Sequence, residues 1–272
     1  MIIDVHCHVW PDHIAPKILA SRPAALDPVF DGTVGGLLRT MDAAGVDRAA
    51  CLGIANVART VHRTNEFIGS IDRTRLIPFG TVHPDLTPEE NLRSLTDNGI
   101  GGVKLHPLFQ ELSLADPRVI AIAHALAEAG IVVITHAGAG GDAAANERGA
   151  PRNLMTLHTA VPGLQLIACH YGGYHRLDEA EAAVLGSPIV LETSWPPRLA
   201  DLDPSRLRSI IRRHGADRIV FGSDWPMADP AAEIATIRSL GLEAAEEAAI
   251  LGGTLAGLLG VSGHATRECA SP

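Results

Sequence analysis

The feature that most constrains the fold of this chain is a regular alternation of short apolar runs with helical segments. Eight runs of mostly apolar, β-branched residues lie at 2–5, 48–52, 76–82, 102–105, 131–135, 164–168, 188–191 and 218–221. Short runs of this kind, bounded by turn residues, are typical of strands that are buried on both faces. Strands that alternate with helices predict a parallel sheet with the helices outside it.

Start and stop signals mark the helices between these runs. Residues 87–90 read Thr-Pro-Glu-Glu, a capping box with proline at the first helical position, and Gly99 ends that helix. An aspartate followed by proline opens three more segments, at Asp116, Asp203 and Asp229, and each of them runs to a glycine. These signals place a helix after several of the predicted strands.

The length of the chain favours a closed barrel over an open sheet. Its 272 residues give about 34 residues for each of eight units, and a (β/α)8 TIM barrel typically has about 250 residues. The alternative is an open doubly wound sheet, but the glycine-rich stretch at 138–141 has Ala143 where the dinucleotide-binding fingerprint requires glycine. We therefore predict an α/β fold, a single TIM barrel over residues 1–261. We expect loops at 21–32 and 137–150 and a disordered tail at 262–272.

Composition excludes several classes of protein. Hydrophobic residues make up 46% of the chain, which is enough for a large core. The formal net charge of −9 argues against nucleic-acid binding, and no apolar run reaches the roughly 18 residues of a membrane helix. The N-terminus lacks the basic start of a signal peptide. No CxxC pattern occurs among the cysteines, so we expect reduced thiols and a cytoplasmic protein, the four being Cys7, Cys51, Cys169 and Cys269.

The first strand ends in a pair of histidines with one residue between them. Residues two apart on a strand share a face, so His6 and His8 are expected to point together into the barrel mouth. That arrangement suits two ligands of one divalent cation. The pair alone is weak evidence, because a chain with 13 histidines contains roughly 0.6 such pairs by chance.

Other strand ends add to this pair. His136 follows the fifth predicted strand, His170 follows the sixth, and Asp224 follows the eighth. Barrel enzymes carry their active sites at the carboxyl ends of the strands. Four histidines and one carboxylate at the same edge of a barrel therefore predict a metal-dependent active site there.

These residues carry a resemblance to a known family. The His-x-His of the first strand, the strand-end His136 and His170, and the sequence Phe-Gly-Ser-Asp-Trp-Pro at 221–226 resemble the amidohydrolase superfamily. Within it, Gly-Val-Lys-Leu-His-Pro at 102–107 and the turn His-Tyr-Gly-Gly that begins at His170 resemble the amidohydrolase-2 branch. That branch includes hydrolases, the aminocarboxymuconate-semialdehyde decarboxylase group, hydratases and lactonases. The resemblance spans roughly residues 2–260.

The resemblance implies that His6, His8, His136 and Asp224 bind one metal ion, predicted to be zinc. His170 would then lie beside the metal-bound water and orient or deprotonate it. Three neutral imidazoles and one carboxylate leave a single positive charge at the ion, where bound water can reach a pKa near 7. Asp224 could also carry the proton from water to the leaving group.

Lys104, at the end of the fourth predicted strand, is unusual because the chain has 20 arginines and only two lysines. A buried lysine can lose its proton at working pH, whereas arginine cannot. Lys104 could bind a substrate carboxylate or carbonyl as an ammonium, or it could be carbamylated and bridge two metals. It could also extend from the barrel rim to solvent. We favour the ammonium role, with one metal.

Further candidates each have a structural alternative. His106 could contact substrate or serve a structural role, and Trp195 and Trp225 could form pocket walls or pack in the core. Arg152 could hold an anionic substrate or be solvated. Glu192, near the end of the seventh predicted strand, could orient a ligand imidazole.

The sequence thus predicts an enzyme: a metal-dependent hydrolase of a small-molecule amide, lactone or ester. The alternative is a metal-dependent non-oxidative decarboxylase, or a hydratase, of a small unsaturated or aromatic carboxylate. A catalytically inactive barrel that acts as a binding protein is a third interpretation, and a serine hydrolase is disfavoured because the chain has no GxSxG. We expect the substrate to carry a carboxylate and leave homo-oligomerisation open.

Overall fold

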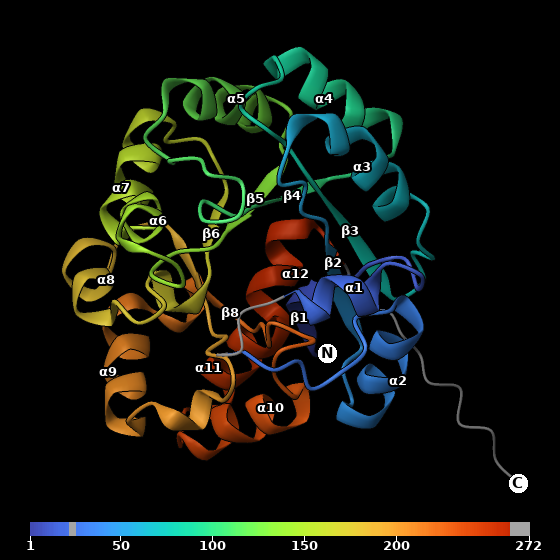
Figure 1. Cartoon of the computed structure of the whole chain (residues 1–272). Coiled ribbons are helices and arrows are strands. Elements are labelled where there is room, and N and C mark those ends of the chain that lie inside the picture. The colour runs from blue at the N-terminus through green and yellow to red at the C-terminus, as the bar shows by residue number, and fades with distance from the viewer. Residues whose placement is uncertain (22–25, 262–272) are drawn as a thin grey trace, which may run out of the picture.

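The eight predicted strands are all present and form one parallel sheet, in the order β1 to β8 along the chain (Figure 1). The computed structural model describes residues 1–21 and 26–261. The strands are β1 (Ile3–His8), β2 (Arg48–Leu52), β3 (Leu76–Thr81), β4 (Gly102–Leu105), β5 (Val132–Thr135), β6 (Leu166–Ala168), β7 (Val190–Glu192) and β8 (Ile219–Val220).

Backbone hydrogen bonds between β1 and the segment that directly follows β8 close the sheet. The amide of Val5 donates to the carbonyl of Phe221 at 3.0 Å, and the amide of His8 donates to the carbonyl of Trp225 at 2.7 Å. Cys7 and Trp225 form a further parallel bridge. The predicted (β/α)8 TIM barrel is therefore confirmed.

Helices surround the barrel, and the predicted caps begin them. The side chains of Thr87, Asp116, Asp203 and Asp229 each accept a hydrogen bond from a backbone amide in the first turn. The α-helices are α1 (Ala15–Ala20), α2 (Val34–Ala44), α3 (Val61–Gly69), α4 (Pro88–Asp97), α5 (Pro117–Glu128), α6 (Ala143–Arg148), α7 (Pro151–Ala160), α8 (Leu177–Ala183), α9 (Pro204–His214), α10 (Pro230–Ser239), α11 (Ala244–Ala248) and α12 (Thr254–Leu259).

The core has two layers. The outer cluster lies between the strands and the surrounding helices. The inner cluster fills the barrel with side chains such as Val5, Phe79 and Ile134, and Leu255 of α12 packs with them. The strands are buried on both faces for this reason, which accounts for their nearly continuous apolar sequence.

Two of the expected loops differ from the prediction or lie partly outside the described residues. The segment 137–150 contains α6, whose Asp142 cap accepts a hydrogen bond from the amide of Ala145. Part of the segment 21–32 and the whole tail 262–272 lie outside the described residues. Among the residues that are described, no helix is both long and apolar enough to span a membrane.

A buried carboxyl group in α10 predicts a pH-dependent stability. Both carboxyl oxygens of Glu233 lie 3.1 Å from the amide of Leu199, and burial raises the pKa of Glu233 from 4.5 to about 8. Between pH 4.5 and 8 the folded state therefore holds a proton that the unfolded state has lost, so this group makes stability fall as pH rises. Each pKa unit corresponds to about 1.4 kcal/mol.

Glu233→Gln should consequently flatten the decline in stability between pH 5 and pH 8.5 by at least about 1 kcal/mol. Urea unfolding at several pH values measures this effect. Glu128→Gln, on the exposed end of α5, is the matched control and should leave the profile unchanged. A Glu233→Gln profile that is parallel to that of the wild type would contradict the assignment.

Candidate metal centre

Three donor atoms converge at the carboxyl end of the barrel. The Nε2 atoms of His6 and His8 are 3.1 Å apart, and Oδ1 of Asp224 lies 3.2 Å from the first and 3.4 Å from the second. Ligand atoms around one tetrahedral zinc ion lie about 3.3–3.4 Å apart. The three side chains thus have the spacing and the donor types to hold one divalent ion, and all three are buried.

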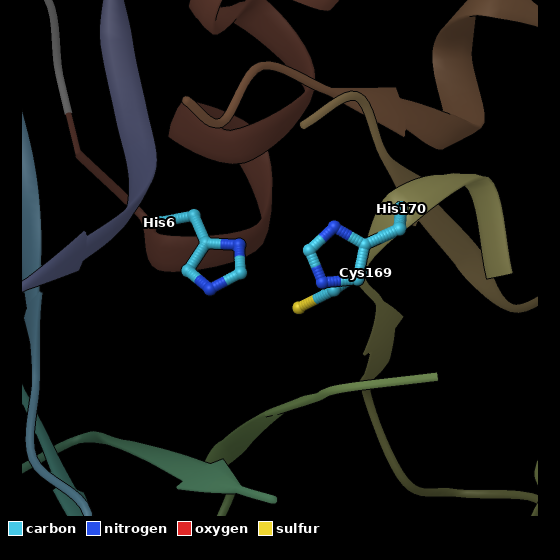
Figure 2. A group of neighbouring side chains, drawn as sticks. All are labelled: His6, Cys169 and His170. Carbon is cyan, nitrogen blue, oxygen red and sulfur yellow. The ribbon is translucent and has the colours of Figure 1, made fainter. Parts of the chain in front are cut away.

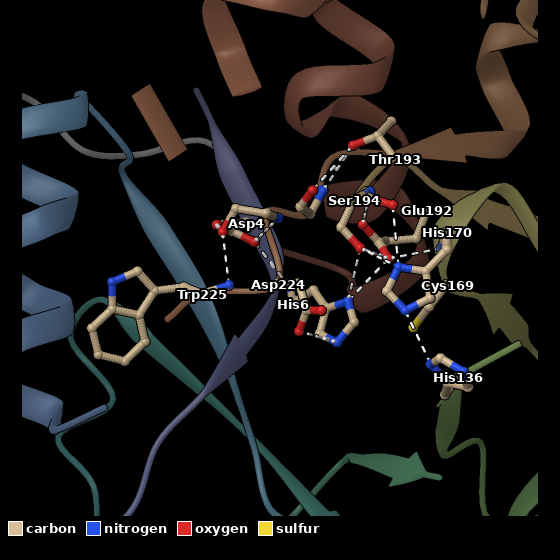
Figure 3. Close-up of polar contacts among 12 residues, drawn as sticks. Asp4, His6, His136, Cys169, His170, Glu192, Thr193, Ser194, Asp224 and Trp225 are labelled. Atoms are coloured by element: carbon tan, nitrogen blue, oxygen red, sulfur yellow. Dashed lines mark hydrogen bonds and ion pairs between the residues drawn. The ribbon is translucent and has the colours of Figure 1, made fainter. Parts of the chain in front are cut away.

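Glu192 sets the orientation of the first histidine (Figure 3). Nδ1 of His6 donates to Oε2 of Glu192 at 3.0 Å, an arrangement in which the neutral form of the ring directs the lone pair of Nε2 at the shared centre. The same carboxylate accepts from the hydroxyl of Ser194 at 2.9 Å and from its backbone amide. A carboxylate behind a histidine is a common support for a metal ligand.

The protonation states also suit metal binding. Burial lowers the pKa of His8 from 6.5 to about 3, so its imidazole is neutral. Burial alone would raise the pKa of Asp224, but the neighbouring rings of His6 and His8 outweigh this and hold that pKa well below its usual range. Neutral imidazoles and an ionised carboxylate are the forms that coordinate metal.

The backbone at Asp224 is held in an unusual conformation. Its φ of 62° is in the left-handed region, which a non-glycine residue adopts at a cost of about 1–3 kcal/mol, and such residues cluster at functional sites. Asp4 fixes this turn, because Oδ2 accepts from the hydroxyl of Ser223 at 2.6 Å and Oδ1 accepts from the amide of Ser223 at 3.1 Å. Oδ1 also accepts from the amide of His6 at 3.0 Å, which ties the β8 turn to β1.

Gly222 leaves room for the supporting carboxylate. A Cβ at this position would lie 2.3 Å from Oε1 of Glu192, closer than non-bonded atoms can approach. The glycine before the Ser-Asp pair therefore allows β8 and the Glu192 side chain to lie side by side.

The other two predicted histidines form a neighbouring pair. Nδ1 of His136 lies 3.1 Å from Nε2 of His170, and Nε2 of His136 lies 3.3 Å from the carbonyl oxygen of Ala139. His136 is in neither three-donor group found among the described residues. His170 has a φ of 59° and its Nδ1 lies 2.9 Å from the Ser194 hydroxyl, while burial lowers its pKa to about 4.

A second group of potential donors shares His6. Its other members are Cys169 and His170, which extend from the end of β6 toward the β1 histidine (Figure 2). Nζ of Lys104 donates to Sγ of Cys169 at 3.0 Å and to Nε2 of His6 at 3.2 Å. Lys104 is 0% exposed, so it does not extend to solvent and lies directly against the proposed ligands.

Two of the remaining candidates, His106 and Trp195, lie beside the histidine cluster. His106 stacks on His136 with ring centroids 4.5 Å apart, and Trp195 packs on Tyr174 at 5.1 Å, which in turn packs on His170 at 5.0 Å. Both therefore adjoin the cluster.

The side chains of two other candidates lie away from the proposed ligands. Trp225 is fully buried, packs against Phe30 and donates from Nε1 to Thr40. Its indole extends away from His6 and Asp224 into the core (Figure 3). The Arg152 side chain is exposed on α7 and pairs with Glu147, which leaves it on the surface.

Sequence reasoning missed Asp4, Ser194 and Cys169. Ser194 lies two residues after Glu192, so the alternation of β7 was an available signal for it. The register of β1 is irregular between Asp4 and Cys7, so alternation gives no such signal for Asp4. Cys169 directly precedes His170, and nothing in its spacing distinguishes it from a core thiol.

Glu192→Gln should weaken metal binding by about 10–100-fold, because an amide holds the His6 ring less firmly than a carboxylate does. Competition with a zinc chelator measures the affinity. Glu179→Gln, on an exposed position of α8, should leave it unchanged. An unaltered affinity in Glu192→Gln would show that the carboxylate does not support the site.

Comparisons with known proteins identify the family of this chain. A family model described as Amidohydrolase matches residues 3–261. No curated protein matches the chain.

Solved structures show the same fold at low sequence identity. They include a 5-carboxyvanillate decarboxylase from Sphingomonas paucimobilis, at 17% identity and a TM-score of 0.71, with 96% of this chain and 99% of that chain covered. A putative 2-pyrone-4,6-dicarboxylic acid hydrolase from Pseudomonas putida has 20% identity and a TM-score of 0.68, with 96% and 98% covered.

A dihydroxybenzoic acid decarboxylase from a Polaromonas species, solved with bound manganese, has 16% identity and a TM-score of 0.72, with 96% of this chain and 97% of that chain covered. Because the family model spans nearly the whole chain and the strand-end histidines and aspartate converge as described, the protein is an enzyme that belongs to the amidohydrolase family.

Proposed function

We propose that this protein is a metal-dependent hydrolase of a small-molecule amide, lactone or ester. The observation that carries the proposal is the convergence of His6, His8 and Asp224 within 3.4 Å of one another. Two imidazoles and a carboxylate match a catalytic zinc site that keeps an open position for water. Zinc is the ion we propose, because imidazole-rich sites suit it.

A divalent ion bound here supplies a Lewis acid that brings the pKa of water near 7. The protein supplies the proton transfers. Asp224 is ionised and stands beside both ligand imidazoles, so its free oxygen can accept the proton of the attacking water and pass it to the leaving group. His170 is neutral and buried, and its ring centroid lies 5.5 Å from that of His6. At this position it can orient that water.

His136 remains our fourth proposed ligand, supported by its place at the end of β5 and by its resemblance to the family motif. The alternative arrangement uses the group His6, Cys169 and His170. The two arrangements differ in whether sulfur contacts the ion, which a spectroscopic measurement distinguishes.

Lys104 is the group that we propose to face the substrate. Its buried ammonium lies 3.2 Å from Nε2 of His6, so a substrate carboxylate or carbonyl held there would lie next to the ion. If Lys104 were carbamylated instead, it would bridge two ions. A content of about one ion per chain favours the ammonium role, and two ions per chain would favour the carbamate.

Non-oxidative decarboxylation of a small unsaturated or aromatic carboxylate is the second candidate. It is supported by the decarboxylases among the structures with the same fold and by the buried cation at Lys104. The same side chains would serve this reaction, with Asp224 or His170 delivering a proton to carbon.

Assays of the zinc-loaded enzyme distinguish the two reactions. A panel of lactones, esters and amides should release acid with metal-dependent turnover, whereas aromatic and muconate-type acids should release no carbon dioxide. Carbon dioxide release without hydrolysis of any panel member would select the decarboxylase. Neither activity in a fully metal-loaded sample would leave the inactive binding protein as the better interpretation.

A further inference from the structure

A large cavity lies beside the metal centre and is not used by the mechanism above. Its volume is about 700 Å³, and it is lined by side chains that follow β1, β2 and β4 and by one face of α3. Pockets for small organic ligands typically have about 300–1,000 Å³. The cavity is therefore large enough for a molecule much bigger than a single aromatic ring.

Two aromatic side chains connect the cavity to the metal centre. Trp10 lines the cavity and stacks on His8 with ring centroids 6.0 Å apart. Phe109 also lines it and stacks on His106 at 3.9 Å, and His106 stacks on His136. A ligand in the cavity would thus lie one side chain away from a proposed metal ligand.

The cavity wall carries apolar surface that folding leaves uncovered. Four apolar side chains that line the cavity are only partly buried: Ile14, Ile18, Ile54 and Phe67. A fifth, Phe109, is 40% exposed. Contiguous apolar surface of this kind on a soluble domain commonly marks a binding site.

One cation stands on the same wall. Arg63, on α3, lines the cavity and is exposed, and within residues 1–21 and 26–261 no ion pair of its guanidinium is found. It lies one turn before Phe67, and the two share a helix face. The wall therefore combines apolar surface with a guanidinium that can pair with an anionic group.

We propose that this cavity binds the body of the substrate, and that the substrate is an amphipathic acid with an apolar aryl or alkyl portion. The apolar portion packs between Trp10, Ile54 and Phe67, an anionic group on it pairs with Arg63, and the reacting carbonyl reaches the metal centre. This assignment of substrate class rests on the proposed function. The binding of the apolar acid itself needs no metal.

The probe is 8-anilinonaphthalene-1-sulfonate, an apolar two-ring anion, monitored by its fluorescence and by energy transfer from tryptophan. The full-length protein should bind it saturably, and chelation of metal should leave binding unchanged. Decanoate should displace it, whereas acetate should not. Binding lost on chelation, or displacement by acetate as effective as by decanoate, would overturn the proposal.

Two variants locate the probe. Ile54→Trp fills the cavity and should weaken binding at least tenfold, and Arg63→Gln should weaken it about fivefold and reduce its dependence on salt. Arg93→Gln, on the exposed face of α4, is the control and should bind as the wild type does. Far-ultraviolet circular dichroism and metal content establish that each variant is folded. Wild-type affinity in folded Ile54→Trp and Arg63→Gln proteins would place the probe elsewhere and overturn the proposal.

The two proposals fail separately. A protein that binds the probe as expected but holds no divalent ion refutes the proposed function and leaves the cavity intact. A protein that holds one ion and hydrolyses a panel substrate, yet fails the probe tests, refutes only the assignment of substrate class.

Discussion

Replacing His6 and His8 together by alanine is expected to abolish metal binding and to reduce turnover by at least about 1,000-fold. The double variant removes two of the three converging donors, so that only Asp224 of that group remains. Metal activation of water contributes several kcal/mol to the transition state, and each 1.4 kcal/mol corresponds to a factor of ten in rate. Elemental analysis and steady-state kinetics on the same sample measure both effects.

The barrel should remain folded in this variant, because both side chains lie at the end of β1 and the inner and outer clusters do not include them. The matched control is His62→Ala with His124→Ala, two exposed histidines on α3 and α5. It should retain both metal and activity. A folded His6/His8 variant that kept its ion would show that other residues bind the metal.

Asp224→Asn is expected to reduce kcat by about 100–10,000-fold, which is the usual contribution of a general acid or base. The amide has the same shape but cannot accept a proton from water, and it removes one negative charge from the ligand set. Metal affinity should fall less than in the double histidine variant, because both imidazoles remain. Comparison of kcat at saturating zinc separates the loss of proton transfer from the loss of metal.

The control for this prediction is Asp12→Asn, which changes an exposed carboxylate four residues after the end of β1. This variant should be as active as the wild type. Turnover of Asp224→Asn within tenfold of the wild type at saturating zinc would exclude Asp224 as the proton carrier. It would leave His170 as the remaining candidate for that role.

The barrel was predictable because its strands are buried on both faces. Such strands must be apolar throughout, so all eight runs stood out, even for β8, which has only two residues in the sheet. The helix caps at Thr87 and Asp203 were predictable because the capping side chain is itself part of the sequence signal. The short helix α6 was missed, because glycine at 140 and 141 outweighed the Asp142 cap and the alanines after it.

The directions of the site side chains were predictable on the strands, where side chains alternate between the two faces, but not in the turns that follow the strands. His6 and His8 lie on β1, so their common direction followed from their spacing. The left-handed backbone at Asp224 breaks this alternation, so the direction of Trp225 could not be derived and its indole lies in the core instead of the pocket. The contact of Lys104 with Cys169 joins two strands through side-chain packing, which spacing along the chain does not reveal.

X-ray absorption at the zinc edge of the zinc-loaded protein tests the central claim most directly. If His6, His8 and Asp224 hold the ion, the first coordination shell contains only nitrogen and oxygen, at about 2.0–2.2 Å. A sulfur atom at about 2.3 Å would instead place the ion on Cys169 and contradict the account, as would a protein that binds no zinc.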